Sequence, residues 1–306
     1  MTRIPRRHHA SDNVSLSPAM EDYLKTIFSI TRNRGTASTQ HLAERLDVSP
    51  ASATKMVKRL AETGLAVHQP YQGVQLTETG RKVAVEVVRH HRLLELYLTQ
   101  ALGFTWDEVH EEAERLEHYI SEKLEARICD FLGNPSFDPH GSPIPTLEGE
   151  IPRRCVLRLD DTRLHELYQV TRVEESDSEH LQNLAKIGLV PGITIQTLGR
   201  PPKGKVHVRV GRQEHLVSPN LCSKISCRPA TRACFPAKEL SHHETGEITQ
   251  VQGQLKSTLQ SQGVQPGALL TRTPSGYTLD GSTGSIPSEV GDVLVEQLTT
   301  QELALQ

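Results

Sequence analysis

The chain has 306 residues, 36% hydrophobic and 4% aromatic, which leaves room for two or three domains with their own cores. No apolar run approaches the roughly 20 residues of a membrane-spanning helix, and no apolar stretch follows the basic start, which argues against membrane and secreted proteins. The five cysteines form no CxxC pair. We therefore expect a cytoplasmic protein with reduced thiols.

The net charge of −3 hides an asymmetry along the chain. Residues 1–76 carry ten Lys/Arg against six Asp/Glu, whereas residues 77–150 carry seven against fifteen. This order favours a module that binds a polyanion followed by a module that binds cations. If the charge asymmetry were the only observation, solvated helix faces would be the preferred explanation.

Residues 1–16 are predicted to form a disordered basic arm, and residues 17–76 a winged helix-turn-helix. Three segments each begin at a serine that suits a helix N-cap, and two short strands follow the last of them. The order helix, helix, turn, helix and two-stranded ribbon is typical of this DNA-binding motif. The predicted helices and strands are 18–32, 38–46, 50–63, 65–68 and 74–76.

The third helix of this motif has small residues in its first turns, so its N-terminus can approach a DNA major groove closely. Hydroxyl and basic side chains there suit base edges and phosphates. Winged helices also bind proteins, so DNA binding rests on the basic balance together with these residues. The predicted contacts to double-stranded DNA are Thr39, Ser49, Pro50, Ser52, Thr54, Lys55, Lys58, Arg59, Tyr71 and Gln72.

Residues 77–133 are predicted to form a helical metal-binding and dimerisation domain, with long helices over 81–102 and 106–131. His91 and Glu95 are one turn apart on the first helix. On the second, His110, Glu114, Glu117 and His118 would fall within an arc of about 100° beside its apolar side. Partly buried carboxylates beside imidazoles need a compensating cation, and a divalent metal ion supplies one. A salt-bridged, solvated helix face is the plainer alternative.

Residues 134–154 are rich in Pro and Gly and are predicted to be a linker. Short β-branched strands then predict a small SH3-like β-barrel over 155–228. The pattern Val170-Thr-Arg-Val173 with a later Pro-Gly turn recurs as Ile248-Thr-Gln-Val251 with its own Pro-Gly turn. The fold class is therefore α+β with a duplicated barrel, the second copy at 242–298.

The winged helix, the segment His91-Arg-Leu-Leu-Glu95 and the segment Val109–His118 together resemble the diphtheria toxin repressor family of iron- and manganese-dependent regulators. The segment Met20-Glu-Asp-Tyr-Leu-Lys25 is similar to the manganese branch of that family. The likeness extends through the linker to the SH3-like domain, which resembles a FeoA domain, and covers about three quarters of the chain.

This resemblance implies a homodimeric regulator that binds about two metal ions per chain. One site would combine Asp22 with Glu114, Glu117 and His118. The second would combine His91, Glu95 and His110 with Asp177 and His180 of the SH3-like domain. The iron branch has Met and Cys at the positions of Asp22 and Glu114, and oxygen in place of sulfur favours Mn²⁺ over Fe²⁺. The binuclear manganese regulators have Glu where this chain has Lys25, so we expect two separate sites.

Two other functions stay open from the sequence. A metallohydrolase would use the same His/Glu residues, but the chain has no HExxH motif, and we expect no enzyme. A winged-helix regulator could instead sense an organic ligand. The His and Glu side chains would then have only a structural role.

Overall fold

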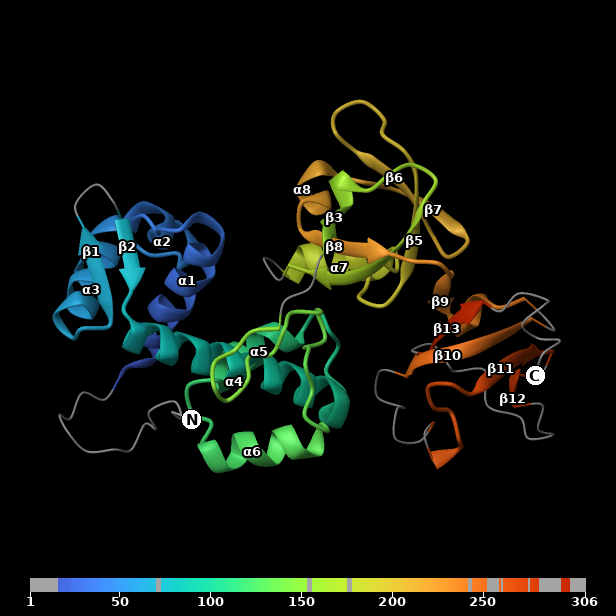
Figure 1. The fold of residues 1–306 in the computed structure, drawn as a ribbon, viewed down its shortest axis with the longest axis horizontal. Coiled ribbons are helices and arrows are strands. Elements are labelled where there is room, and N and C mark those ends of the chain that lie inside the picture. The colour runs from blue at the N-terminus through green and yellow to red at the C-terminus, as the bar shows by residue number, and fades with distance from the viewer. Residues whose placement is uncertain are drawn as a thin grey trace. The chain divides into compact units, whose positions relative to one another are not determined.

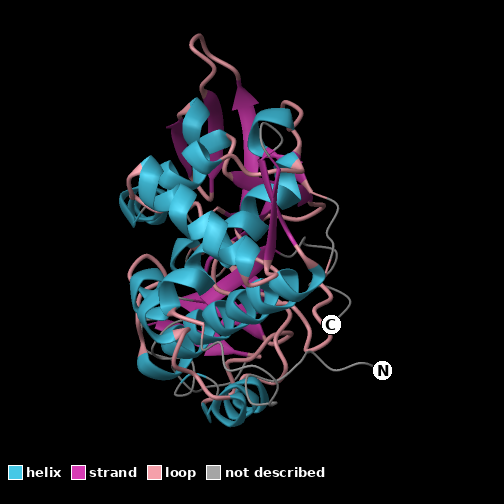
Figure 2. Cartoon of the chain, turned by 90° about the vertical axis from the view of Figure 1, so that its left-hand side faces the viewer, coloured by secondary structure: helices cyan, strands magenta, loops and turns pink. Residues whose placement is uncertain are grey.

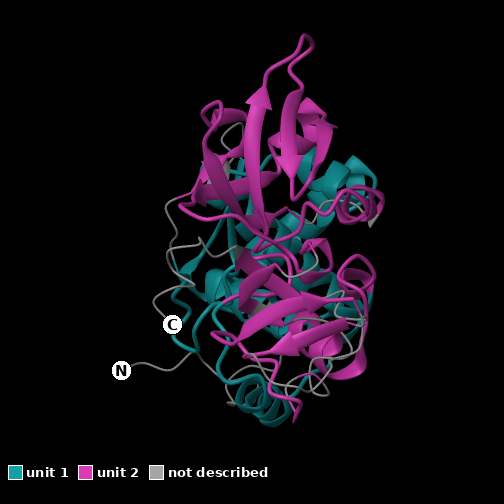
Figure 3. Ribbon diagram, turned by 90° about the vertical axis from the view of Figure 1, so that its right-hand side faces the viewer, with its two compact units in different colours: residues 1–94, 112–136, 143–153 teal, residues 95–111, 137–142, 154–306 magenta. Residues whose placement is uncertain are grey.

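The computed structural model describes residues 16–69, 73–152, 156–174, 178–241, 244–251, 259, 261–274, 276–280 and 293–297. The chain divides into two compact units (Figure 3): residues 1–94, 112–136 and 143–153 form the first, and residues 95–111, 137–142 and 154–306 the second. Helices dominate the first unit and strands the second (Figure 2). Within the described chain, no helix has the length and apolar character needed to cross a membrane.

The first unit begins with the predicted winged helix-turn-helix (Figure 1). Ser17, Ser38 and Ser49 cap three helices by accepting hydrogen bonds from the backbone N–H three residues later. An antiparallel pair of strands follows, and Ala37 adds a bridge to Val74. These elements are α1 (Pro18–Arg34), α2 (Thr39–Arg45), α3 (Pro50–Glu62), β1 (Ala66–Gln69) and β2 (Gly73–Leu76).

One hydrophobic core joins α1 to the recognition helix α3 and to the start of the long helix α4 (Glu78–Leu102). Leu24 and Ile27 of α1 are fully buried, as are Val57 and Leu60 of α3. Because these side chains share one close-packed core, we expect a displacement of α1 to move α3 as well.

The prediction of one continuous helix over 106–131 is wrong, because the helix is interrupted near its middle. The structure has α5 (Val109–Leu116), a turn over 117–119, and α6 (Glu122–Phe131). Ser121 ends the continuity because its side chain accepts a hydrogen bond from Leu124 N and so caps a new helix. Glu117 and His118 therefore follow α5, and the arc that was to hold them beside His110 does not exist.

The described part of the segment predicted as a linker, residues 134–152, contributes residues to both units. Ile144 is buried in the first unit. In the second, His140 O accepts a hydrogen bond from Val173 N. Gly141 has φ +80°, and a Cβ there would lie 2.0 Å from Thr171 O, so only glycine permits this approach. The Pro/Gly content thus encodes fixed turns here.

The second unit contains the SH3-like barrel, a six-stranded antiparallel sheet in the order β3-β8-β4-β5-β6-β7. Fully buried aliphatic side chains such as Ile193, Ile195 and Val208 fill its interior. Its strands are β3 (Leu157–Arg158), β4 (Leu167–Val173), β5 (Thr194–Gly199), β6 (Val206–Val210), β7 (Gln213–Val217) and β8 (Ile225–Pro229); its helices are η1 (Leu159–Asp161), α7 (Ser178–Lys186) and α8 (Pro219–Cys222).

The second sheet repeats the order of the first, as the sequence repeat predicts. Its order β9-β13-β10-β11-β12 matches β3-β8-β4-β5-β6 strand for strand among the described residues. Gly192 N donates to Val170 O, and Gly267 N donates to Ile248 O, each at 2.8 Å. Its elements are β9 (Cys234–Pro236), η2 (Ala237–Glu239), β10 (Thr245–Val251), β11 (Leu269–Thr273), β12 (Gly276–Leu279) and β13 (Val293–Gln297).

The second copy begins earlier than the predicted residue 242, because β9 and η2 are the counterparts of β3 and η1. Phe235 and Ala237 are buried within the same core as Val295. The prediction missed this start because β9 has only three residues and no alternating pattern.

Candidate metal centre

The first cluster of metal-ligand side chains lies where α1 meets the end of α5. Asp22, Glu117 and His118 each offer one ligand atom, and these atoms lie within 4.8 Å of one another. His118 Nε2 is 3.0 Å from Asp22 Oδ1 and 3.6 Å from Glu117 Oε1. The cluster therefore joins the winged helix-turn-helix to the helical domain inside one compact unit.

Glu117 is the buried member of this cluster, with a side chain that is 0% exposed. Lys25 Nζ donates to its Oε1 at 2.6 Å, and His91 Nδ1 lies 2.5 Å from its Oε2. Burial alone would raise the pKa of Glu117, but the hydrogen bond from His91 and the charge of Lys25 hold it below its ordinary value. Lys25 thus supplies positive charge to the carboxylate, and the pKa of Lys25 is raised in return, because Glu117 and Glu114 outweigh its own burial.

His118 is held between two carboxylates of α1. Its Nε2 faces Asp22, and its Nδ1 is 2.7 Å from Glu21 Oε2. Hydrogen bonds to Asp22 and Glu21 raise the pKa of His118 to about 9. Glu21 is buried and was missed by the sequence analysis. It occupies the outer position from which carboxylates commonly orient a ligating histidine.

The donors of this cluster fit a divalent metal ion. Two atoms bound to one ion at about 2.1 Å are at most about 4.2 Å apart, so separations within 4.8 Å need only small side-chain shifts. Carboxylate oxygen with imidazole nitrogen suits Mn²⁺, Fe²⁺ and Zn²⁺, and no sulfur atom is in the group.

A second cluster lies in the other unit around Glu95, which is fully buried. Its Oε1 is 3.0 Å from His110 Nδ1, and its Oε2 is 3.5 Å from His140 Nδ1. Glu95, Asp138 and His140 form a group of candidate ligands with the same 4.8 Å spacing. The segment predicted as a linker thus contributes two metal-ligand side chains that the sequence analysis did not name.

Backbone contacts orient both of these side chains. His140 Nε2 is 2.7 Å from Trp106 O. A carbonyl oxygen only accepts hydrogen bonds, so Nε2 carries the proton and Nδ1 faces Glu95. Asp138 Oδ1 accepts from the N–H of His140 and of Ser142, which closes a tight loop. Such outer contacts are typical of built metal sites.

The structure separates some of the predicted ligands from their groups. Glu114 is half exposed and contacts Lys25 at 3.4 Å, outside the group formed by Asp22, Glu117 and His118. His91, by contrast, stays with its predicted group, because His91, Glu95 and His110 each offer one ligand atom within 4.8 Å of the others. His91 Nδ1 also contacts Glu117 of the first cluster. His180 lies in the first turn of α7 and belongs to no candidate group among the described residues, and Asp177 lies outside them.

The predicted DNA-reading residues lie on α2, α3 and the turn between them. Lys55, Lys58 and Arg59 are exposed on α3, and Thr39 begins α2. Local hydrogen bonds engage the hydroxyls: Ser49 Oγ caps α3 and contacts Ser52 Oγ, and Thr54 Oγ1 donates to Pro50 O. Their oxygen lone pairs still allow contacts to DNA. Tyr71 and Gln72 lie outside the described residues.

Three family profiles match consecutive parts of the chain. Residues 15–74 match the N-terminal DNA-binding domain of iron-dependent repressors, residues 77–146 their metal-binding and dimerisation domain, and residues 157–229 the FeoA domain. The iron-dependent repressor IdeR of Mycobacterium tuberculosis is 34% identical over 212 residues, which cover 65% of this chain and 92% of IdeR. The regulator MntR of Lysinibacillus sphaericus is 35% identical over 116 residues, 38% of this chain and 83% of MntR.

Solved structures agree with these matches. A manganese-dependent transcriptional repressor in complex with manganese is 36% identical, with a TM-score of 0.63 over 69% of this chain and all of that chain. ScaR with bound Cd²⁺ is 30% identical, with a TM-score of 0.61 over 69% of this chain and 99% of that chain. The chain belongs to the iron-dependent repressor family of metal-dependent transcriptional repressors.

Proposed function

We propose that this protein is a manganese-responsive repressor that binds operator DNA as a homodimer and controls genes of metal homeostasis. The observation that carries the proposal is the set of Asp22, Glu117 and His118, whose ligand atoms are all oxygen or nitrogen. Hard oxygen ligands favour Mn²⁺ over softer metals, although Fe²⁺ shares much of this chemistry. The cytoplasm is the compartment where such a regulator meets both metal and DNA.

The protein side of the mechanism follows from where these residues lie. A bound divalent ion would supply positive charge shared by Asp22, Glu117 and His118. Asp22 belongs to α1, whose core residues also pack on α3. Drawing Asp22 toward Glu117 and His118 therefore fixes α3 relative to the helical domain. In a dimer this sets the separation of two recognition helices, which must match half-sites about 34 Å apart. Metal and DNA affinities are then coupled in both directions.

A second ion is proposed at Glu95. His110 and His140 face its two carboxylate oxygens, and Asp138 completes the group, with His91 one turn earlier on α4. Asp177 and His180 remain candidate ligands from the FeoA domain. Together these residues support about two ions per chain.

Dimerisation is supported by large apolar side chains exposed on α5, α6 and the turn between them. Tyr119 is 76% exposed and Phe131 65%, and Leu116 and Leu124 are also exposed. Leu124 and Phe131 are seven residues apart and share one face of α6. Apolar groups clustered on a helical surface mark a protein interface, and a second copy of this chain is the proposed partner.

The experiment that tests this function measures operator binding against metal. Fluorescence anisotropy with DNA from upstream regions is followed while Mn²⁺, Fe²⁺ or Zn²⁺ is added, and sedimentation gives the stoichiometry. We expect binding of two chains per site that requires metal and has its lowest midpoint with Mn²⁺. Binding that ignores all three metals would overturn the proposal.

Lys55→Ala is expected to weaken operator binding at every metal concentration while metal affinity stays unchanged. Lys55 is exposed on α3, a helix that contributes no candidate metal ligand among the described residues. Removing one phosphate contact should also reduce the slope of log affinity against log salt by about 1. Lys123→Ala, an exposed lysine of α6, is the control. Unaltered DNA affinity with lost metal binding would contradict the assignment.

Glu21→Ala is expected to lower the affinity of the first site for Mn²⁺ by about 10- to 100-fold, although Glu21 is no proposed ligand. Its carboxylate holds His118 Nδ1, so its loss frees the imidazole to rotate. Glu21→Gln keeps an acceptor at the same position and should recover part of the affinity. Competition against a metal indicator gives both values, and an unchanged midpoint in Glu21→Ala would remove Glu21 from the site.

A further inference from the structure

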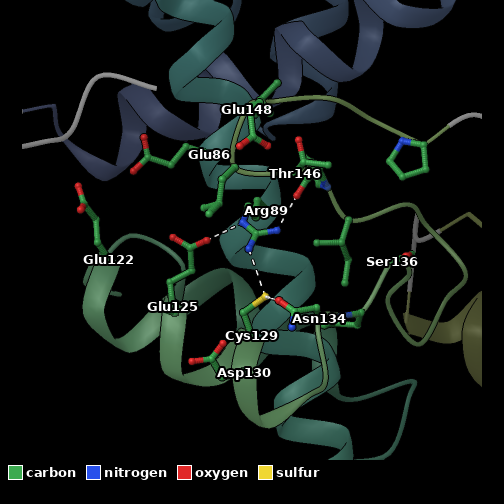
Figure 4. A pocket seen from close by; sticks show the side chains of 17 residues that line it. Glu86, Arg89, Glu122, Glu125, Cys129, Asp130, Asn134, Ser136, Thr146 and Glu148 are labelled. Carbon is green, nitrogen blue, oxygen red and sulfur yellow. Dashed lines mark hydrogen bonds and ion pairs between the residues drawn. The ribbon is translucent and has the colours of Figure 1, made fainter. Parts of the chain in front are cut away.

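The first unit contains a cavity of about 570 Å³ that neither metal cluster uses (Figure 4). It lies between α4, α6 and the described part of the predicted linker. We call it the acidic groove. Its size is within the range of sites that bind drug-sized molecules or short peptides. The acidic groove is lined by residues 85, 86, 89, 122, 125, 126, 129, 130, 134–136, 144–148 and 152.

The floor of the acidic groove is neutral and largely apolar. Arg89 is buried there, and its guanidinium donates to Glu125, to Pro145 O and to Cys129 Sγ. This pairing leaves the Arg89 charge compensated by Glu125. Val85 and Ile144 are buried, and further proline and leucine side chains complete the apolar lining.

The rim of the acidic groove carries four more carboxylates, on Glu86, Glu122, Asp130 and Glu148. Figure 4 shows them around Arg89, from α4, α6 and the linker segment. Glu122, Asp130 and Glu148 are exposed. An apolar floor inside an acidic rim selects a ligand with an apolar body and flanking positive charges.

The chain itself carries a segment of this chemistry in its sequence. Residues 3–7 read Arg-Ile-Pro-Arg-Arg, an apolar pair flanked by three arginines. Leu16 packs against the same core as Ile151, and that core contains Val85 of the groove wall. The nine residues from Arg7 to Leu16 span up to about 30 Å when extended, which is close to the diameter of a small domain.

We propose that residues 3–7 of the N-terminal arm dock in the acidic groove of their own chain, with Ile4 and Pro5 on its apolar floor and Arg3, Arg6 and Arg7 at its rim. The same arginines suit DNA phosphates. If the protein binds operator DNA as proposed above, DNA and the acidic groove compete for the arm. The docking itself requires neither metal nor DNA.

The test uses full-length protein with Arg3, Arg6 and Arg7 all changed to Ser, which we call the arm-neutral protein. In this variant the acidic groove should no longer be occupied by the N-terminal arm of the same chain. A fluorescent peptide of residues 1–12 is titrated with it, without metal or DNA, and anisotropy is recorded. We expect saturable binding that weakens with salt. Wild-type protein should bind the peptide at least 10-fold more weakly, because its own arm is present at a high effective concentration.

Matched variants of the arm-neutral protein locate the binding surface. Glu122→Lys/Asp130→Lys should reduce peptide affinity at least 10-fold, and the gentler Glu122→Gln/Asp130→Asn should reduce it in part. Glu44→Lys/Glu62→Lys makes the same charge change on exposed residues of α2 and α3 and should leave it unaltered. A peptide with Ile4→Ser/Pro5→Ser should also bind weakly.

Three outcomes would overturn the proposal. The first is equal peptide binding by wild-type and arm-neutral protein. The second is equal loss in both pairs of charge-reversed variants, which would show attraction by net charge alone. The third is the absence of peptide binding together with dissociation of the dimer by Glu122→Lys/Asp130→Lys, which would assign the groove to a second copy of the chain. Failure of metal-dependent DNA binding would leave these measurements unaffected.

Discussion

His118→Ala is expected to abolish metal-activated operator binding while the protein stays folded. The change removes one ligand from a site whose other members, Asp22 and Glu117, lie on either side of it. Structural metal sites contribute roughly 10–16 kcal/mol from about four ligands, so one ligand is worth about 3 kcal/mol, or about 100-fold in affinity. Calorimetry with Mn²⁺ and anisotropy with operator DNA measure the two losses separately.

Glu117→Gln tests the same metal site by changing its buried ligand. The amide keeps the shape of the carboxylate but loses its charge, so Lys25 and His91 no longer face a negative charge at position 117. We expect metal binding to fall at least as far as in His118→Ala, with some loss of stability. His215→Ala, a histidine of β7 outside the candidate groups among the described residues, is the control. A Glu117→Gln protein that responds to Mn²⁺ at the wild-type midpoint would exclude this site.

The winged helix-turn-helix and the FeoA domain were predictable because their signals are local. Ser17, Ser38 and Ser49 each cap a helix through an atom three residues away, and sequence alone carries that information. The duplicated barrel was visible for the same reason, since the Pro-Gly turns bond to their own first strands at Val170 and Ile248. Local sequence signals of this kind can be recognised without knowledge of the tertiary contacts.

Two of the predicted ligand groups come together in the structure: Asp22, Glu117 and His118, and His91, Glu95 and His110. The single arc from His110 to His118 was wrong, because it assumed one unbroken helix and α5 ends at Leu116. Asp138 and His140 were hidden because they lie in a Pro-rich segment and meet Glu95 only through tertiary structure. Glu21 was passed over because one acidic residue in the first turn of a helix is explained by the helix dipole alone.

Glu125→Gln is expected to destabilise the first unit by about 3–5 kcal/mol, the usual effect of breaking a buried ion pair. Glu125 Oε1 accepts from Arg89 Nε at 2.5 Å, and its Oε2 is 3.2 Å from His90 Nε2. Both side chains of the ion pair are buried, so the variant leaves the Arg89 charge without compensation. Urea unfolding followed by circular dichroism measures the change. Glu122→Gln, an exposed carboxylate on the same helix, is the control, with a loss below about 1 kcal/mol.

The loss in Glu125→Gln should depend on pH in a defined direction. Burial alone would raise the pKa of Glu125, but His90 and Arg89 hold it below the ordinary value of 4.5. A carboxylate whose pKa is lower in the folded state stabilises the fold above its unfolded pKa, and that contribution disappears as the pH falls through the folded pKa. The difference between wild type and variant should therefore stay constant from pH 7 to about pH 5. It should shrink as the pH falls from 4.5 through the lower folded pKa, because the unfolded wild-type chain takes up a proton at Glu125 before the folded protein does.

A double change separates the ion pair from the packing around it. Arg89→Met/Glu125→Leu replaces the pair with apolar side chains of similar size, and such replacements are often neutral or stabilising. We expect the double variant to be more stable than Glu125→Gln alone, since no uncompensated charge stays buried. The two changes are then strongly non-additive, as expected for residues in direct contact. If the double variant lost as much stability as the sum of its single changes, the ion pair would not be the source of the effect, and the loss in Glu125→Gln would have to arise from packing of α6 against α4.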